Sequence, residues 1–335
     1  MDIKITKARL LNVVNYDWVK MILAALAIIA AWSLIFTTTA TRITDGHAFY
    51  LTLFEDVYMV SDSNNKLLAK AYSDGDLSFD VLETHIERIQ QAGNYSAFYM
   101  LTQIRMTTKE ADVLIIGGGN EERDLENKNL SSVQSLVSMG KLYNFEEFLD
   151  SARAYCVNSK FIVENEDGYT VNAEEIRKYF VQDRIVSARN YRKTYISDEK
   201  IEEGVKGEIA RIEKIYTSYL GVKKAIEKAK EEGNDILWYT VPTYFEDDKV
   251  VEKEKAAYGI DLGKLYNSYL SADEDKKEQL SDLKTVWYTF DEEGQATMDG
   301  LVMAAVDFSD TQHDLQYEDL SFIYNIIRNY STYGE

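Results

Sequence analysis

Two tryptophan–tyrosine pairs are the side chains of this chain best suited to recognising a small ligand. Trp238-Tyr239 and Trp287-Tyr288 each lie in an apolar segment that is predicted to be a strand. Aromatic faces bind sugars and other planar molecules, and neighbouring strand residues point to opposite sides, so one member of each pair can face a cleft. The alternative is that these rings pack in the core. We take Trp238 and Trp287 as candidate ligand-binding residues.

A glycine cluster supplies the third candidate. The apolar run Val113–Ile116 leads into glycines, as in a dinucleotide-binding turn. Gly117 and Gly119 fit the first two positions of G-x-G-x-x-G, but the third position is Glu122, whose charge repels a pyrophosphate. A tight turn at a strand end therefore explains the glycines better. Asn120, in this loop, is taken as a ligand-binding residue.

The cysteine and histidine content does not favour nucleophilic catalysis or zinc binding. Cys156 is the only cysteine, and His47, His85 and His313 form no close pair in the sequence. A nucleophilic cysteine needs a neighbouring base, so we expect Cys156 to be a buried structural thiol. A single cysteine also excludes an internal disulfide.

The acidic runs do not have the pattern of a cation site. Glu164–Gly168 and Asp273–Asp275 lack the alternating oxygen ligands and the late bidentate Glu of a calcium loop. We expect a turn and the start of a solvated helix instead. With 57 acidic residues, adjacent carboxylates such as Glu146-Glu147 arise by chance. We predict no catalytic residue, no metal and no cofactor.

An uncharged run near the N-terminus predicts a membrane anchor. Met21–Thr41 has neither charge nor proline. As a helix it would be about 30 Å long, which is the thickness of a bilayer's hydrocarbon core. We therefore divide the chain into a head (residues 1–20), a transmembrane helix (21–41) and one large domain (42–335). A cleaved signal peptide and a buried core helix are the alternatives.

The charges beside this run predict its orientation. Lysine and arginine are concentrated before it, whereas only Arg42 follows closely. The positive-inside rule then puts the N-terminus in the cytoplasm and the large domain outside the cell membrane, as a single-pass protein. The net charge of the chain is -20. Such a charge repels nucleic acid and anionic lipid headgroups, so neither is expected as a general partner.

Apolar patterning predicts the elements that position these residues. Short apolar runs predict strands at Ala48–Phe54, Ala111–Ile116, Phe161–Val163, Tyr169–Val171, Ile236–Val241, Thr285–Phe290 and Leu301–Val306. Helical spacing predicts helices at Ser78–Gln91, Ser131–Met139, Asp198–Glu232 and Leu320–Tyr330. Asn144 and Asn172 are expected to cap two more helices. Strands separated by helices predict an α/β architecture.

Two segments carry a resemblance to a known family. Ala111–Ile116, continued by the helix that ends at Met139 and by Gly140–Leu149, resembles extracellular solute-binding proteins of ABC importers. Tyr258–Asp261 is similar to a phrase in the second half of that family. The resemblance implies a periplasmic-binding-protein-like fold with two α/β lobes and a ligand cleft between them. The head Asn15–Lys20 resembles membrane-anchored proteins of Gram-positive bacteria.

The resemblance and the anchor together imply a membrane-anchored, extracytoplasmic solute-binding-like protein that serves an ABC transporter. Its partners would be membrane lipid around the N-terminal helix, a permease or another membrane protein, and a small-molecule ligand. The alternative is a non-enzymatic interaction or assembly subunit of a membrane complex. An extracellular hydrolase is less favoured, because no nucleophile-and-base motif is present.

Overall fold

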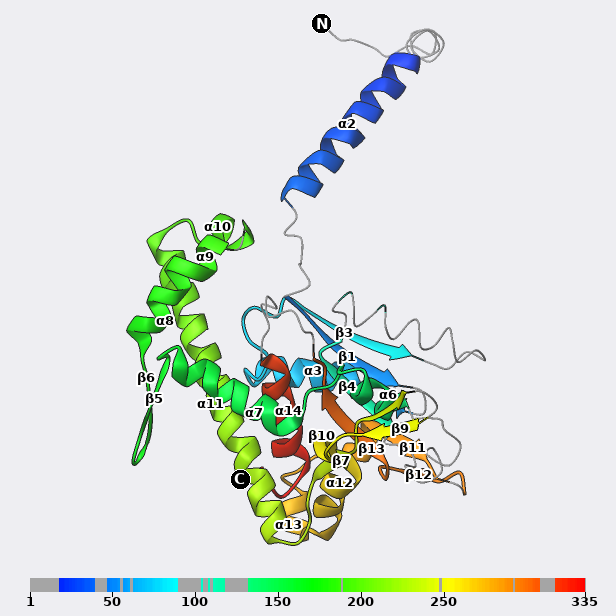
Figure 1. Ribbon diagram of the computed structural model, residues 1–335. Coiled ribbons are helices and arrows are strands. Elements are labelled where there is room, and N and C mark those ends of the chain that lie inside the picture. Colours follow the sequence, from blue (N-terminus) through cyan, green and yellow to red (C-terminus); the bar gives the residue numbers. More distant parts are fainter. Residues whose placement is uncertain are drawn as a thin grey trace, which may run out of the picture. The chain divides into compact units, whose positions relative to one another are not determined.

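The computed structural model describes residues 18–39, 47–54, 57–60, 63–89, 104, 108, 111–117, 132–187, 189–246, 249–291, 293–307 and 317–334 (Figure 1). The chain separates by its internal contacts into two units, Met1–Arg42 and Ile43–Glu335. All the described strands belong to the second unit.

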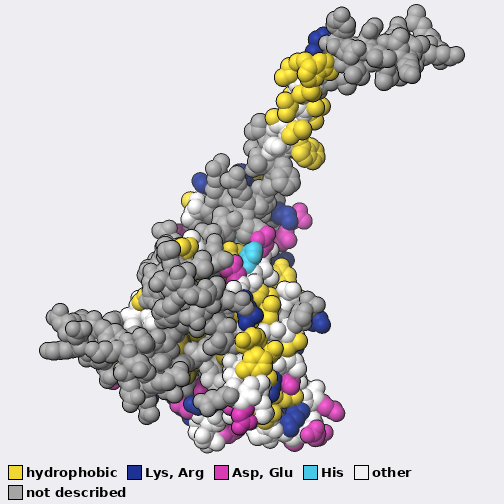
Figure 2. Space-filling model, turned by 90° about the vertical axis from the view of Figure 1, so that its right-hand side faces the viewer, with side chains coloured by type: hydrophobic (Ala, Val, Ile, Leu, Met, Phe, Trp, Pro, Cys, Tyr) yellow, Lys and Arg dark blue, Asp and Glu magenta, His cyan; other side chains and the backbone are white. Residues whose placement is uncertain are grey.

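The described part of the first unit is a single helix, α2 (Trp18–Thr39, 22 residues). Apolar side chains such as Leu23, Ile28 and Trp32 are exposed on all its sides, and Figure 2 shows this surface as largely hydrophobic. Within the residues that the structure describes, no helix combines the length and the apolar character needed to cross a membrane. The transmembrane helix predicted at 21–41 therefore has no support from the structure itself.

Six strands form the central sheet of the second unit, in the order β3-β1-β4-β13-β10-β7. Strand β1 pairs in parallel with β3 and β4, whereas the pairings of β13 with β4, β10 with β13 and β10 with β7 are antiparallel. The predicted α/β class is confirmed, with a mixed sheet at its centre. The six strands are β1 (Ala48–Phe54), β3 (Glu83–Ile89), β4 (Val113–Gly117), β7 (Leu237–Thr240), β10 (Ala256–Asp261) and β13 (Leu301–Ala305).

Strands from both halves of the sequence share this one sheet, because β13 lies between β4 and β10. The other sheets among the described residues have three, two and two strands. A second large sheet, which a second α/β lobe would need, is thus not present in the described part of the chain. The strands of the small sheets are β2 (Tyr58–Met59), β11 (Trp287–Phe290), β12 (Ala296–Thr297), β5 (Ile162–Asn165), β6 (Gly168–Val171), β8 (Thr243–Glu246) and β9 (Lys249–Glu252).

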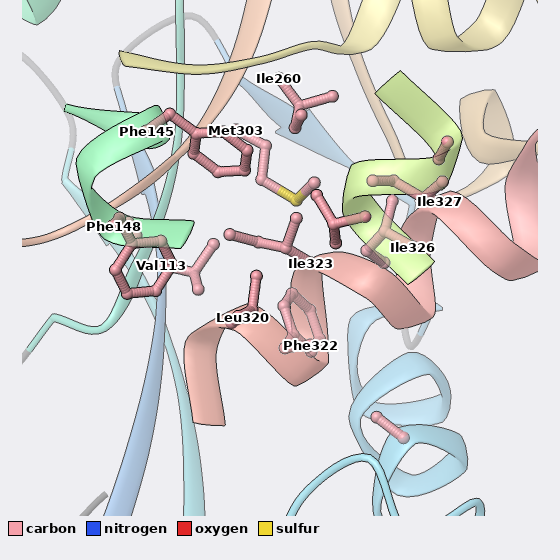
Figure 3. Packing of buried hydrophobic residues seen from close by; sticks show 14 of the residues in the cluster. Val113, Phe145, Phe148, Ile260, Met303, Leu320, Phe322, Ile323, Ile326 and Ile327 are labelled. Atoms are coloured by element: carbon pink, nitrogen blue, oxygen red, sulfur yellow. The ribbon is translucent and has the colours of Figure 1, made fainter. Parts of the chain in front are cut away.

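Strand β4 shows how the central sheet is buried on both faces. Val113 and Ile115 belong to the larger apolar cluster, which includes residues of α14 (Glu318–Tyr330) such as Leu320 and Ile323 (Figure 3). Leu114 and Ile116 belong to a smaller cluster on the other face. Successive strand residues point to opposite faces, so a continuous apolar run is what a doubly covered strand requires.

The helices begin where their capping residues predict. The side chain of Asn144 accepts hydrogen bonds from the N–H groups of Glu146 and Glu147, and that of Asn172 accepts one from Glu175. Both predicted caps are thereby confirmed. The helices and the 3-10 turn that accompany the sheet are α3 (Ser63–Ser73), α6 (Ser132–Ser138), α7 (Phe145–Asn158), α12 (Leu262–Ser271), α13 (Glu274–Lys277), η3 (Leu283–Thr285) and α14.

A group of consecutive helices, which we name the helical arm, extends from the sheet region (Figure 1). Its 34-residue helix α11 (Asp198–Glu231) packs against α7 and α14. The apolar spacing that predicted this helix gives it a buried stripe, which includes Val205, Ile212, Ile215 and Val222. The other members of the arm are α8 (Ala173–Tyr179), the π-helical turn η2 (Phe180–Arg184), α9 (Ile185–Ser187) and α10 (Arg189–Thr194).

The helix predicted at Ser78–Gln91 is wrong. Within this segment, Glu83–Ile89 forms strand β3, paired residue by residue with β1. The apolar spacing in this segment suits a helix, but β3 is an edge strand of which only Ile89 is fully buried. Pairing of its backbone with β1 outweighs the weak side-chain pattern.

Candidate functional site

Arg184 lies at the centre of a buried ion network between the helical arm and the sheet. Its guanidinium donates to the carboxylate of Asp80 (Nη2–Oδ2, 2.5 Å) and also bonds Glu208. Its Nη2 donates to the hydroxyl of Tyr191 at 3.1 Å, and that hydroxyl donates to Asp80. Asp80 lies between α3 and β3, so these contacts tie the arm to the sheet domain.

Arg211 extends the network to the C-terminal helix. Its Nε donates to Glu318 Oε1 at 2.6 Å, and its Nη1 donates to Glu208 Oε1 at 3.2 Å. Glu208 and Arg211 are three residues apart on α11, and therefore lie on the same face of the helix. Glu318 is the first residue of α14. Glu208 accordingly bonds both arginines and connects two otherwise separate ion pairs.

The charges of this network are almost completely removed from water. The most exposed of its charged side chains, Arg184, is only 7% exposed. Burial alone would lower the pKa of Arg211, but Glu318 and Glu208 outweigh it and raise that pKa further above its ordinary value. Burial raises the pKa of Glu318, against the effect of Arg211. Separating the two sides would leave buried charges without partners, at a cost of about 3–5 kcal/mol for each broken pair.

A second ionic cluster, centred on Asp76, lies close by. Arg328 Nη2 donates to Asp76 Oδ2 at 2.9 Å, and Lys214 and Asn325 also contact this carboxylate. Lys214 comes from α11, and Asn325 and Arg328 come from α14. Asp76 follows α3, so this cluster also joins the arm to the sheet domain.

Two further buried carboxyl groups are coupled electrostatically. Burial raises the pKa of Asp112 from 3.8 to about 8, although its Oδ2 accepts a hydrogen bond from the Tyr50 N–H at 2.7 Å. Burial, and then the nearby Asp112, raise the pKa of Asp319 well above its ordinary value. Asp112 is therefore mostly protonated at neutral pH, where ordinary aspartates are ionised.

Two cavities are lined in part by residues of the network. One has a volume of about 150 Å³ and is lined by residues that include Asp76, Phe79, Arg211, Lys214 and Glu318. The other has a volume of about 270 Å³ and lies beside the π-helical turn, where π-helical geometry is often associated with function. Its lining residues include Tyr179, Gln182, Asp183, Arg184, Val186 and Tyr191.

The structure does not bring the candidate ligand-binding residues together. Trp287, in β11, is fully buried in the larger apolar cluster. Trp238, in β7, is half-buried and packs against the smaller cluster. Asn120 lies outside the described residues. Neither tryptophan lines either of the two cavities, so a ligand-binding role for these residues stays a prediction.

The expected structural roles of Cys156 and of the acidic runs are confirmed. Cys156 is buried, and burial raises the pKa of its thiol to about 12. Glu164, on the β5–β6 hairpin, pairs with Arg153 of α7, and Asp273 caps α13. No group of three or more potential metal ligands occurs among the residues described in Figure 1.

Comparison of the chain with protein-family models, with curated proteins and with solved structures finds no match. The resemblance to solute-binding proteins therefore stays a prediction from short motifs.

The ion network is the feature that sequence reasoning missed, although one signal for it was present. The apolar stripe of α11 includes Val205, Ile212 and Ile215, whose spacing places Glu208 and Arg211 on the same side of the helix. Charged residues inside a buried stripe indicate buried ion pairs. Their partners, however, are distant in the sequence and come from irregular segments or helix ends.

Proposed function

We propose that the chain is a membrane-anchored, non-enzymatic interaction subunit whose helical arm and sheet domain form one rigid body for docking to another membrane protein. The observation that carries this proposal is the buried ion network between Arg184, Asp80, Glu208, Arg211 and Glu318. Lobes that close on a solute need a joint that opens easily. The joint between the arm and the sheet domain instead consists of buried ion pairs, and each pair loses stability when a shared partner is removed.

The sequence supports the anchoring part of the proposal. Met21–Thr41 is uncharged, and basic residues precede it. The helix predicted over this run would present apolar side chains on all sides, and a bilayer supplies the apolar environment that such side chains need. With only a few residues between this run and strand β1, the domain would work close to the outer surface of the membrane.

Solute capture is the second candidate. It is favoured by the cavity of about 270 Å³ beside Arg184, which combines aromatic, amide and guanidinium groups. Such a combination suits a small polar ligand. In solute-binding proteins the ligand lies in a cleft between two lobes. Here the ligand site would lie within the helical arm instead.

One purification separates the two candidates. The full chain is extracted from its own membrane in mild detergent, and the proposal expects one membrane protein to copurify at a constant ratio. The variant Arg211→Met, which disrupts the network, should lower that ratio, whereas Lys255→Met, at an exposed site between β9 and β10, should not.

A thermal-shift screen of the same preparation against sugars, amino acids and short peptides completes the test. The proposal expects no solute to raise the melting temperature. A solute that raises it, together with a chain that purifies alone, would replace the proposal with solute capture.

A further inference from the structure

One end of the helical arm is basic, although the chain as a whole is acidic. Residues 185–197 contain Arg189, Arg192 and Lys193 and no acidic residue, in a chain whose net charge is -20. The acidic chain as a whole repels anionic surfaces, but this basic end does not. The segment comprises α9, α10 and the turn that leads into α11, and Figure 1 shows α9 and α10 together at the end of the arm.

Two basic side chains of this end, Arg192 and Lys193, have no acidic partner among the described residues. Arg192 and Lys193 are exposed, and neither forms an ion pair with a described residue. Elsewhere in the arm, Arg177 is paired with Glu202 and Lys200 is paired with Glu203. The positive charge of α10 is thus available to an external partner.

Two exposed aliphatic side chains accompany these charges. Ile196 is 79% exposed and Val186 is 58% exposed. We name Val186, Arg192, Lys193 and Ile196 the basic tip. Aliphatic groups beside unpaired basic groups are typical of surfaces that rest in the headgroup region of a membrane.

Contacts of Tyr191 relate the basic tip to the point where the chain enters the domain. The Tyr191 ring is buried and lies against His47, with 5.6 Å between ring centroids. Arg192 and Lys193 follow Tyr191 at roughly 100° and 200° around the helix, so they point away from that contact. His47 comes six residues after Thr41, and six residues span about 20 Å at most.

We propose that the basic tip lies on the anionic phospholipid headgroups of the membrane that holds the N-terminal helix. This inference rests on the proposed anchoring. The attraction need not be strong, because an anchored chain keeps the tip at a high effective concentration near the surface. It acts only within about 10 Å of the surface at moderate salt, a range that the short connection from the anchor allows.

The test uses the full chain in lipid nanodiscs and one fluorescent label. Thr194→Cys, on α10, carries the label, because the buried thiol of Cys156 does not compete for it. Lipids with a quencher in the headgroup report contact. Nanodiscs of phosphatidylglycerol and phosphatidylcholine should quench the label, and pure phosphatidylcholine nanodiscs should quench it much less. Added salt should weaken the quenching.

Charge removal supplies the matched comparison. R192Q/K193Q should lower the equilibrium constant for contact roughly 30-fold, which follows from the loss of two basic groups at an anionic surface. K223Q/K224Q removes an adjacent pair of exposed lysines from α11 and should leave the quenching unchanged. Absent quenching, or an equal loss in both variants, would overturn the inference.

The anchor and the tip can fail separately. Nanodisc-bound chain is first isolated by its size, and chain that does not enter nanodiscs would refute the anchoring itself. Chain that enters them while its label stays unquenched would refute only the contact of the tip. The label could also stay unquenched because the tip contacts a second copy of the chain. Two chains in one nanodisc, detected by size, would then assign the tip to self-association and overturn the lipid contact.

Discussion

The two halves of α11 are held in contrasting ways. The first half contributes Glu208 and Arg211 to a network of buried charges, whereas the second half packs through small and aliphatic residues such as Val222, Ala225 and Ile226. Apolar packing tolerates modest changes of shape, because each atom contributes little. A buried charge loses most of its stabilisation when a single partner is removed. The arm therefore depends on specific partners at one end and on shape at the other.

The strongest way to break this contrast is Arg211→Met. Glu208 and Glu318 lose a shared cation in a buried site, so the free energy of unfolding should fall by about 3–5 kcal/mol, measured by urea denaturation of the full chain. The companion variant R211M/E318Q also removes the charge of Glu318, leaves Glu208 paired with Arg184 and should recover most of that loss. A single variant that costs less than about 1 kcal/mol would contradict a network that depends on every partner.

The pH dependence of stability should come from the carboxyl pair. The folded chain keeps a proton on Asp112 up to about pH 8, whereas the unfolded chain releases it near the ordinary value of 3.8. The unfolded state thus binds fewer protons in this window, so the free energy of unfolding falls as pH rises from about 4 to about 8. Thermal melts at stepped pH should show this slope.

Asp112→Asn is the control for that slope. The amide oxygen can still accept the Tyr50 N–H, but it cannot ionise. The decline in melting temperature between about pH 4 and pH 8 should therefore become shallower, and an unchanged slope would assign the dependence to other groups.

The apolar half of α11 should respond to added volume. A Cβ on Gly221 would overlap the ring of Tyr324, so Gly221→Ala should lower the free energy of unfolding by about 1–3 kcal/mol, despite the better helix propensity of alanine. In the background Tyr324→Ala, the same substitution should become neutral or stabilising. Urea denaturation of all four chains gives the coupling between the two sites, and a coupling near zero would contradict this packing.

The smallest effect is expected from Ile226→Val. It removes one methyl group from the apolar half of the helix and should cost about 0.5–1.5 kcal/mol in the same denaturation assay. The cost should be the same in the R211M background, because the two sites are far apart along α11. Strong coupling would mean that the two halves are not independent.

Local patterns in the sequence predicted much of the fold. Strand β1 agrees with its predicted bounds, β4 and β13 differ by two residues or fewer at each end, and α11 ends one residue early. These elements have strong periodicity or clear turn signals. Strand β3 was missed because it is formed by backbone pairing with β1, which is distant in the sequence. The side-chain pattern of β3 itself does not indicate this pairing.

The candidate site was less predictable than the fold. Trp287 was proposed as a ligand contact from its residue type, yet in the structure it fills the core. No local sequence pattern marks Asp80 or Glu318 as a network residue. Each pairs with an arginine more than one hundred positions away in the sequence. Burial of a charge is a property of the assembled fold, which one-dimensional spacing does not contain.

The position of β13 has a consequence for how the chain is made. This strand completes the sheet between β4 and β10 but follows the entire helical arm in the sequence. During synthesis, β4 must therefore wait with an open edge until the ribosome has produced nearly all of the domain. Such long-range closure is slow and exposes strand edges to wrong partners. Cells that make this protein should consequently depend on chaperones that shield the nascent chain.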